Sequence, residues 1–233
     1  MRPEKSAADQ RAYQLLIFDW DGTLMDSSAR IVQCMHCAAN HLQLPPADEQ
    51  AVRHVIGLSL EVATQRLYPD LQGDLFQQFV DEFRRQSLGS MLEASRLFAG
   101  AKTVLHDLSQ QGYQLAVATG KSRRGLDQDM LRHGVAELFP ISRTADETFS
   151  KPHPQMLEEI LTDHDLEVQH ALMIGDTEYD LQMAVNAGMD ALGVSYGVHP
   201  AERLLKLQPR GVIDDILQLP EWLNKNDKGL TDE

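Results

Sequence analysis

The sequence predicts an α/β fold, in which a Rossmann-like parallel sheet has helices on both faces and carries an inserted all-α cap domain. Two observations lead to this prediction. Short apolar runs typical of buried strands alternate with segments of helical periodicity, and such alternation implies parallel strands joined by crossover helices. One long interval near the N-terminus breaks the alternation, because it contains helical patterns only.

The predicted strands are compact apolar runs bounded by turn-forming residues. The first run ends at an Asp and a Gly, and the four runs lie at 13–18, 114–119, 171–175 and 191–195. Segments with helical periodicity precede or separate the later runs, at 101–109, 122–132, 154–162 and 177–187. The strands should therefore all run in the same direction within one sheet.

The inserted unit is expected at 26–96, where helical patterns occur at 29–42, 60–67 and 75–88. Placed after the first strand, a block of this size would cover the open end of the sheet as a smaller cap domain. The core domain then comprises 13–25 and 97–223. The remaining ends, 1–12 and 224–233, are expected to be flexible.

The charge balance restricts the partners of the protein. Lys and Arg number 21 against 35 Asp and Glu, which gives a net charge of −14. Such a surface repels nucleic acid and anionic membranes. No apolar run approaches the length that crosses a bilayer, and residues 1–12 lack the apolar stretch of a signal peptide. We therefore expect a cytoplasmic protein without a nucleic-acid or membrane partner.

The two cysteines, Cys34 and Cys37, are too few for a disulfide framework. Their CxxC spacing could suit zinc or redox chemistry, but neither the further ligands nor a thioredoxin-like context accompanies it. We interpret them as small apolar residues on a helix.

Polar residues gather where the predicted strands end. In an open parallel sheet, ligands bind beyond these carboxyl ends. The residues found there are Asp19, Asp21, Thr119, Gly120, Lys121, Asp176 and Asp180, and Lys151 stands isolated before another helix. Each alone could be a turn former, a loop charge or, for Thr177 with Asp180, a helix cap. Together the carboxylates would repel one another, and a hard cation such as Mg²⁺ would relieve that repulsion.

Four segments resemble the motifs of the haloacid dehalogenase-like superfamily, in the subgroup with a helical cap, and similarity is greatest to phosphoglycolate phosphatase-like enzymes. They read Asp-Trp-Asp-Gly-Thr-Leu at 19–24, Thr-Gly-Lys at 119–121, Lys-Pro at 151–152 and Gly-Asp-Thr-Glu-Tyr-Asp at 175–180. The first and last are specific signals. The resemblance implies a Mg²⁺-dependent phosphatase that acts on a small phosphorylated metabolite.

The resemblance also implies a role for each residue. Asp19 would attack phosphorus and form an aspartyl-phosphate, and Asp21 would serve as general acid and base. The phosphoryl group would be bound by Thr119, Gly120 and Lys151. Mg²⁺ would be held by Asp19, the backbone carbonyl of Asp21 and Asp176, with Asp180 bound through water or in support.

Two other functions stay open at this point. A sugar phosphomutase of the same family would share every core residue. A receiver-type phospho-switch, which is no enzyme, also uses a phosphorylated Asp with Mg²⁺ on a parallel sheet. Against the switch stand Asp21, which provides a base for hydrolysis, and the helical insertion, which would enclose a substrate.

Choice of substrate should depend on the cap, because the core contacts only the phosphoryl group. The segment 53–59 is a candidate, since a glycine there separates two helical patterns and donors cluster around it. Its candidate residues are Arg53, Gly57 and Ser59, and Lys121 of the core could also reach the substrate. The alternative is a plain loop between helices.

Overall fold

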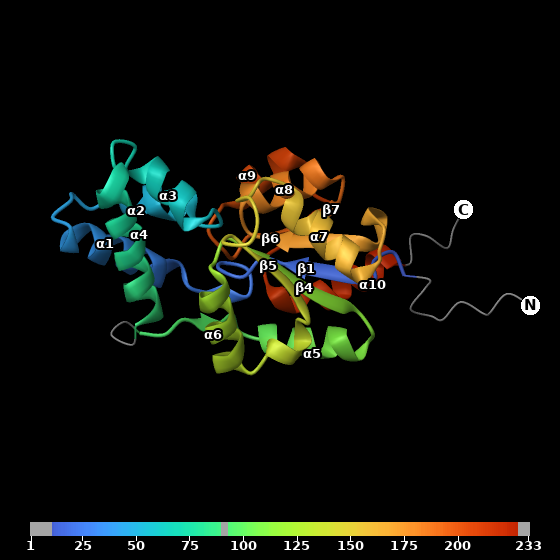
Figure 1. The fold of residues 1–233 in the computed structure, drawn as a ribbon. Coiled ribbons are helices and arrows are strands. Elements are labelled where there is room, and N and C mark those ends of the chain that lie inside the picture. Colours follow the sequence, from blue (N-terminus) through green and yellow to red (C-terminus); the bar gives the residue numbers. More distant parts are fainter. Residues whose placement is uncertain (1–10, 90–92, 228–233) are drawn as a thin grey trace, which may run out of the picture.

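The computed structural model describes residues 11–89 and 93–227. Its main sheet has six parallel strands in the order β5-β4-β1-β6-β7-β8, so β1 lies centrally between β4 and β6. The strands are β1 (Leu15–Phe18), β4 (Gln114–Thr119), β5 (Ile141–Thr144), β6 (Ala171–Gly175), β7 (Asp190–Val194) and β8 (Gly211–Ile213). The predicted α/β class with a Rossmann-like parallel sheet is confirmed (Figure 1).

Both faces of the central strands are buried, which explains why they are continuous apolar runs. Side chains alternate between the faces. In β1, Leu16 and Phe18 join one hydrophobic cluster, whereas Leu15 and Ile17 join another. The first cluster packs under α5 (Ala101–Gln110), α6 (Arg123–His133) and α10 (Leu219–Asp227). The second packs under α7 (Gln155–His164), α8 (Glu178–Ala187) and α9 (Ala201–Leu204). The sheet is thus a middle layer between helices (Figure 1).

The chain after β1 forms a group of helices, which we call the helical group and which lies to one side of the sheet (Figure 1). It consists of α1 (Ser28–His41), α2 (Glu49–Val55), α3 (Leu60–Leu67) and α4 (Gly73–Leu88). A separate hydrophobic cluster, with Met35, Val52 and Phe79 among its members, holds these helices together. An antiparallel pair of β2 (Met25–Asp26) and β3 (Arg96–Leu97) brings the two connecting segments side by side.

Several elements differ from the sequence predictions. The edge strands β5 and β8 were not predicted, because β5 carries Ser142 and Arg143 among its apolar residues and β8 has 3 residues. Helix α2 was also not predicted, and it places Arg53 in a last helical turn rather than in a loop. At the C-terminus, α10 continues to Asp227, so the helix passes the expected start of a flexible end at 224.

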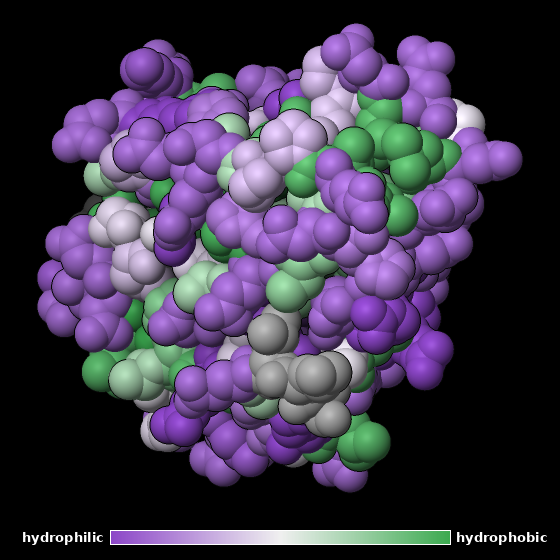
Figure 2. Space-filling model, turned by 90° about the vertical axis from the view of Figure 1, so that its left-hand side faces the viewer, coloured by the Kyte–Doolittle hydropathy of each residue, from purple (hydrophilic) through white to green (hydrophobic). Residues whose placement is uncertain are grey.

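The surface that Figure 2 shows is largely hydrophilic, as the charged composition of the chain predicts. Within residues 11–89 and 93–227, no helix combines the length and the apolar character that spanning a membrane requires. Figure 2 views the molecule from the side of the helical group, and hydrophilic residues cover most of that face. The helices of the group therefore turn their apolar sides inward.

Candidate active site

The sheet order brings the predicted site residues to one edge. Strands β4, β1 and β6 are neighbours and run parallel, with Phe18 in register with Val117 and Ile174. Asp19, Thr119 and Asp176 follow these strands or end them, so they meet at the same carboxyl edge. The helical group faces this edge across a pocket, whose lining includes residues of both parts of the chain.

Asp19, Asp176 and Asp180 form a buried cluster, which we call the acidic cluster. Each offers an oxygen, and these oxygens all lie within 4.8 Å of one another. Burial, together with the charges of Asp180 and Asp176, raises the pKa of Asp19 well above its usual value, although Lys151 opposes the shift. Burial and then Asp180 raise the pKa of Asp176 to about 7. The cluster is therefore crowded with negative charge when no cation is bound.

Lys151 supplies one positive charge to the acidic cluster. Its Nζ donates to Oδ1 of Asp19 and to Oδ1 of Asp180, both at 2.6 Å. The ammonium group is fully buried. Burial alone would lower the pKa of Lys151, but Asp180 and Asp19 outweigh it and raise the pKa above the usual value. Lys151 therefore remains charged and offsets part of the repulsion.

Hydrogen bonds orient the other two carboxylates. Asp176 accepts from Oγ1 of Thr23 at 2.9 Å and from the backbone N–H of Val198 at 2.8 Å. Asp180 accepts from the backbone N–H and the hydroxyl of Thr177, at 2.9 and 2.7 Å. This second arrangement is a capping box at the start of α8. The cap that Thr177 and Asp180 suggested in the sequence is thus present, and the same carboxylate also belongs to the acidic cluster.

The acidic cluster fits a hard divalent cation. Oδ2 of Asp19 is buried and has no hydrogen-bond partner among the described residues, which is costly for a carboxylate oxygen unless a ligand engages it. Gly22, with φ of +95°, leaves room beside the cluster, since a Cβ there would lie 2.2 Å from Oδ2 of Asp176. An all-oxygen donor set of this kind suits Mg²⁺.

Asp21 lies apart from the acidic cluster and lines the pocket. Its Oδ1 accepts from Oγ of Ser27 at 2.7 Å and from Nζ of Lys121 at 3.2 Å. Lys121 also pairs with Asp129 of α6 at 3.2 Å. The sequence analysis missed Ser27 and Asp129, because neither belongs to a motif or to a strand end. Lys121, which the sequence analysis names as a possible substrate contact, lines the pocket and also holds the carboxylate of Asp21.

Thr119 and Gly120 end β4 beside Asp19. Thr119 is buried, and its hydroxyl accepts from the backbone N–H of Lys121 at 3.2 Å. Gly120 lies against the helical group, since a Cβ there would be 2.5 Å from the carbonyl oxygen of Leu58 and 2.6 Å from that of Gly57. The core and the helical group therefore touch backbone to backbone next to the predicted phosphate site.

Of the three residues of the helical group that the sequence analysis names as candidates for selecting the substrate, only one lines the pocket. Gly57 lines the pocket, whereas Arg53 and Ser59 do not. Arg53 donates to Glu49 and to the hydroxyl of Ser28. Ser59 caps α3, and its N–H donates to Ser150 at 2.9 Å. The segment 53–59 thus contributes Val55, Ile56, Gly57 and Leu58 to the pocket lining.

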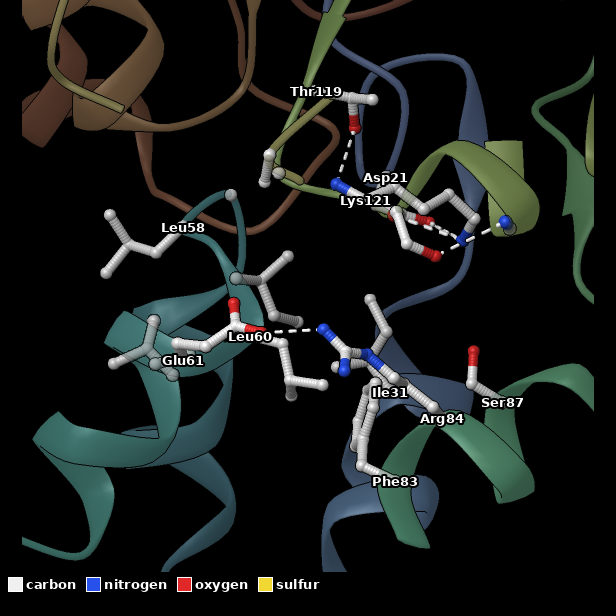
Figure 3. A pocket seen from close by; sticks show the side chains of 18 of the residues that line it. Asp21, Ile31, Leu58, Leu60, Glu61, Phe83, Arg84, Ser87, Thr119 and Lys121 are labelled. Atoms are coloured by element: carbon white, nitrogen blue, oxygen red, sulfur yellow. Dashed lines mark hydrogen bonds and ion pairs between the residues drawn. The ribbon is translucent and has the colours of Figure 1, made fainter. Parts of the chain in front are cut away.

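Other residues of the helical group make most of the pocket wall. Figure 3 shows Ile31, Leu58, Leu60 and Phe83 around the space below Asp21, with an ion pair between Glu61 and Arg84 beside them. The sequence analysis did not single these residues out. Apolar residues at helical spacing predict a core face, and their sequence contains no signal that distinguishes a pocket wall from a core.

Comparison with known proteins identifies the family of this chain and several similar proteins. A family model described as haloacid dehalogenase-like hydrolase matches residues 16–194. Phosphoglycolate phosphatase of Vibrio cholerae is 33% identical, with 91% of this chain and 97% of that protein covered. The crystal structure of a predicted phosphoglycolate phosphatase from Haemophilus somnus has a TM-score of 0.83 at 27% identity, with 91% and 98% of the two chains covered. A putative β-phosphoglucomutase from Bacteroides vulgatus shares the fold, with a TM-score of 0.75 at 20% identity over 93% and 90% of the two chains.

Proposed function

Because the chain belongs to the haloacid dehalogenase-like hydrolase family, we propose that it is a Mg²⁺-dependent phosphatase that hydrolyses small phosphate monoesters through an aspartyl-phosphate on Asp19. The observation that carries this proposal is the buried Oδ2 of Asp19, which has no hydrogen-bond partner in the part of the chain that the structure describes. Oδ1 of the same carboxylate is held by Lys151. The side chain is therefore oriented, and one oxygen remains available for bonding.

Bond formation begins at Asp19. Its carboxylate attacks phosphorus in line while the bond from phosphorus to the ester oxygen breaks, which gives a mixed anhydride on Asp19 and a free alcohol. Asp21, held by Ser27 and Lys121 on the pocket side, donates the proton that the departing oxygen needs. It then takes a proton from the water that attacks the phosphoenzyme, so phosphate leaves and both carboxyls return to their starting states.

The remaining residues bind the phosphoryl group and offset charge. The hydroxyl of Thr119 and the N–H of Gly120 are proposed to donate to phosphoryl oxygens, and Lys151 to offset their charge. Asp19, Asp176, Asp180 and the backbone carbonyl of Asp21 would hold Mg²⁺, which when bound polarises the phosphoryl group and offsets its negative charge. The acidic cluster provides three of these ligands within 4.8 Å.

The helical group is proposed to act as a cap, with the domain boundaries at 26 and 96 expected from the sequence. Its apolar side chains line the pocket next to Asp19 and Asp21, so the leaving group of the ester would lie against it. We place the substrate among small phosphorylated metabolites and the enzyme in the cytoplasm, as the sequence analysis expects.

The test of this proposal is Asp19→Asn. The variant keeps the shape of the side chain but lacks the nucleophile, so we expect Mg²⁺-dependent release of phosphate from an aryl phosphate to fall by at least about a thousandfold. Asp107→Asn, on the exposed side of α5, is the matched control and should retain full activity. Wild-type-like turnover by folded Asp19→Asn would exclude the mechanism.

The same assay separates the alternatives. A phosphomutase would need a sugar bisphosphate to convert one sugar phosphate into its isomer, with little release of phosphate. A phospho-switch would keep its aspartyl-phosphate for minutes after treatment with acetyl phosphate. Rapid, repeated release of phosphate from simple esters excludes both.

A further inference from the structure

The pocket wall opposite the acidic cluster is built mainly from apolar side chains. Ile31 comes from α1, Val52 from α2, Leu60 from α3 and Phe83 from α4. The side chains of Ile31, Leu60 and Phe83 point into the space next to Asp21 and Thr119 (Figure 3), and Val52 lines the same pocket. A leaving group attached to a phosphoryl group at Asp19 would therefore replace water along an apolar surface.

The cations of this wall already have carboxylate partners. Among the described lining residues, Lys121 and Arg84 are the only two cations. Lys121 pairs with Asp21 and Asp129, each at 3.2 Å. Arg84 pairs with Glu61 at 2.7 Å and lies 3.7 Å from Asp81. The charge of each cation is thus already offset by a carboxylate, so a carboxylate on the substrate would gain less from it than from an unpaired cation.

The acidic side chains of the pocket wall also disfavour a carboxylate on the substrate. Asp21, Glu61 and Asp146 line the pocket in addition to Asp19, so acids outnumber cations in the lining. An anionic leaving group would enter a region of like charge without a free cation, whereas an uncharged apolar one loses nothing there.

We infer that the ester accepted by this protein has an uncharged, largely apolar leaving group, and that the Glu61–Arg84 pair disfavours leaving groups with a carboxylate. This inference rests on the proposed phosphatase function. The inferred substrate differs from the one in the name of the phosphoglycolate phosphatase relatives. Glycolate carries a carboxylate, whereas this pocket offers apolar side chains and paired cations.

The first experiment compares esters on the wild-type enzyme. Isobutyl phosphate matches phosphoglycolate in shape, with two methyl groups in place of the two carboxylate oxygens. We expect isobutyl phosphate to have the higher kcat/KM, and we expect kcat/KM to rise about fourfold for each added methylene from ethyl to butyl phosphate. A preference for phosphoglycolate would overturn the inference alone. Turnover of no ester would overturn the proposed function and the inference with it.

The second experiment uses Glu61→Gln, which releases Arg84 from its main partner. The ratio of kcat/KM for phosphoglycolate to that for isobutyl phosphate should rise at least about tenfold, and the ratio cancels the difference in leaving-group reactivity. Glu49→Gln is the matched control, because it frees Arg53 in the same helical group but outside the pocket lining. An unchanged ratio in Glu61→Gln, or an equal rise in Glu49→Gln, would contradict the inference.

The double variant Glu61→Gln/Arg84→Met provides a further check, because it removes both charges of the pair and leaves no unpaired Glu61 in the pocket wall. If Arg84 is occupied by Glu61 in the wild type, the loss of both charges should leave the ratio for the two esters within about twofold. If Arg84 instead binds a substrate carboxylate, the variant would lose activity on phosphoglycolate selectively, and the inference would be wrong.

Discussion

At the level of single residues, the site depends on how a buried lysine distributes one charge between two carboxylates. Lys151 contacts Asp19 and Asp180 at the same distance, 2.6 Å. It therefore fixes the proposed nucleophile and part of the predicted metal site with one side chain. Because all three groups are buried, none can be solvated if a partner is lost.

This arrangement predicts the effect of Lys151→Met. Removing one partner of a buried pair leaves an uncompensated charge, which costs about 3–5 kcal/mol. A carboxyl group can take up a proton instead, so we expect a loss near 3 kcal/mol in the free energy of unfolding. Urea denaturation in the presence of EDTA measures it.

The matched control for Lys151→Met is Lys225→Met, which breaks an exposed pair with Glu221 on α10. Exposed pairs contribute less than about 1 kcal/mol. Equal losses in the two variants would show that Lys151 does not compensate the acidic cluster.

The sequence predicted which residues meet at the site, because parallel strands place their carboxyl ends together and motif positions follow from strand ends. It did not predict how Asp21 is held. Ser27 and Asp129 reach Asp21 and Lys121 through tertiary packing, and Asp129 lies within α6 without a motif around it. The sequence also did not predict that Arg53 lies in α2, where it points toward Glu49 and Ser28 and not into the pocket.

At the level of secondary-structure elements, the turn after β4 packs directly against the helical group. Gly120 has no side chain, so the carbonyls of Gly57 and Leu58 can pack directly on its Cα. Gly57 itself has φ of +99°, which few other residues adopt readily. Two glycines thus allow the segment between α2 and α3 to lie beside Thr119.

Gly120→Ala should disturb this contact. Its Cβ would lie 2.5 Å from the carbonyl oxygen of Leu58, and a backbone carbonyl cannot move aside as a flexible side chain does. We expect kcat/KM for an aryl phosphate to fall by at least about tenfold, because a displacement near 1 Å can cost that much or more. Hydrogen exchange should become faster at 55–60.

The change in hydrogen exchange should be confined to the turn and its neighbours. Protection of the sheet amides in β1 and β6 should remain unchanged, since the clash is local to the turn. Wild-type activity together with unchanged exchange at 55–60 would show that this contact does not position the helical group.

Element prediction succeeded where burial is complete and failed where it is partial. Strands β1, β4 and β6 are apolar throughout their central parts and were found close to their observed bounds. Strand β5 is half-buried at Ile141, Ser142 and Arg143, so its pattern does not separate it from a loop. Helix α2 has 7 residues, which is too few for helical periodicity to stand out.

At the level of the whole molecule, polar contacts connect the helical group to the core outside the pocket as well. The hydroxyl of Tyr179, on α8, donates to the carbonyl of His54 at 2.9 Å, and Arg66 of α3 donates to the same hydroxyl at 3.0 Å. His199 of the core packs against the ring of His54 at 5.3 Å between centroids. The helical group therefore contacts the core at Tyr179 and at Ser150 as well as at Gly120.

If the acidic cluster holds Mg²⁺ as proposed, the metal should stabilise the whole fold, because Asp19 follows β1, Asp176 follows β6 and Asp180 lies in α8, so the three carboxylates meet only in the folded chain. A ligand that binds only the folded state adds about 2.7 kcal/mol at a hundred times its Kd. For a chain of this size, such a gain corresponds to a rise of roughly 5–10 °C in Tm. We expect this rise in Mg²⁺ but not in NaCl of equal ionic strength, and EDTA should reverse it. Asp176→Asn should lose more than about half of the rise, whereas Asp107→Asn should keep it. An equal response of the two variants would place the metal elsewhere.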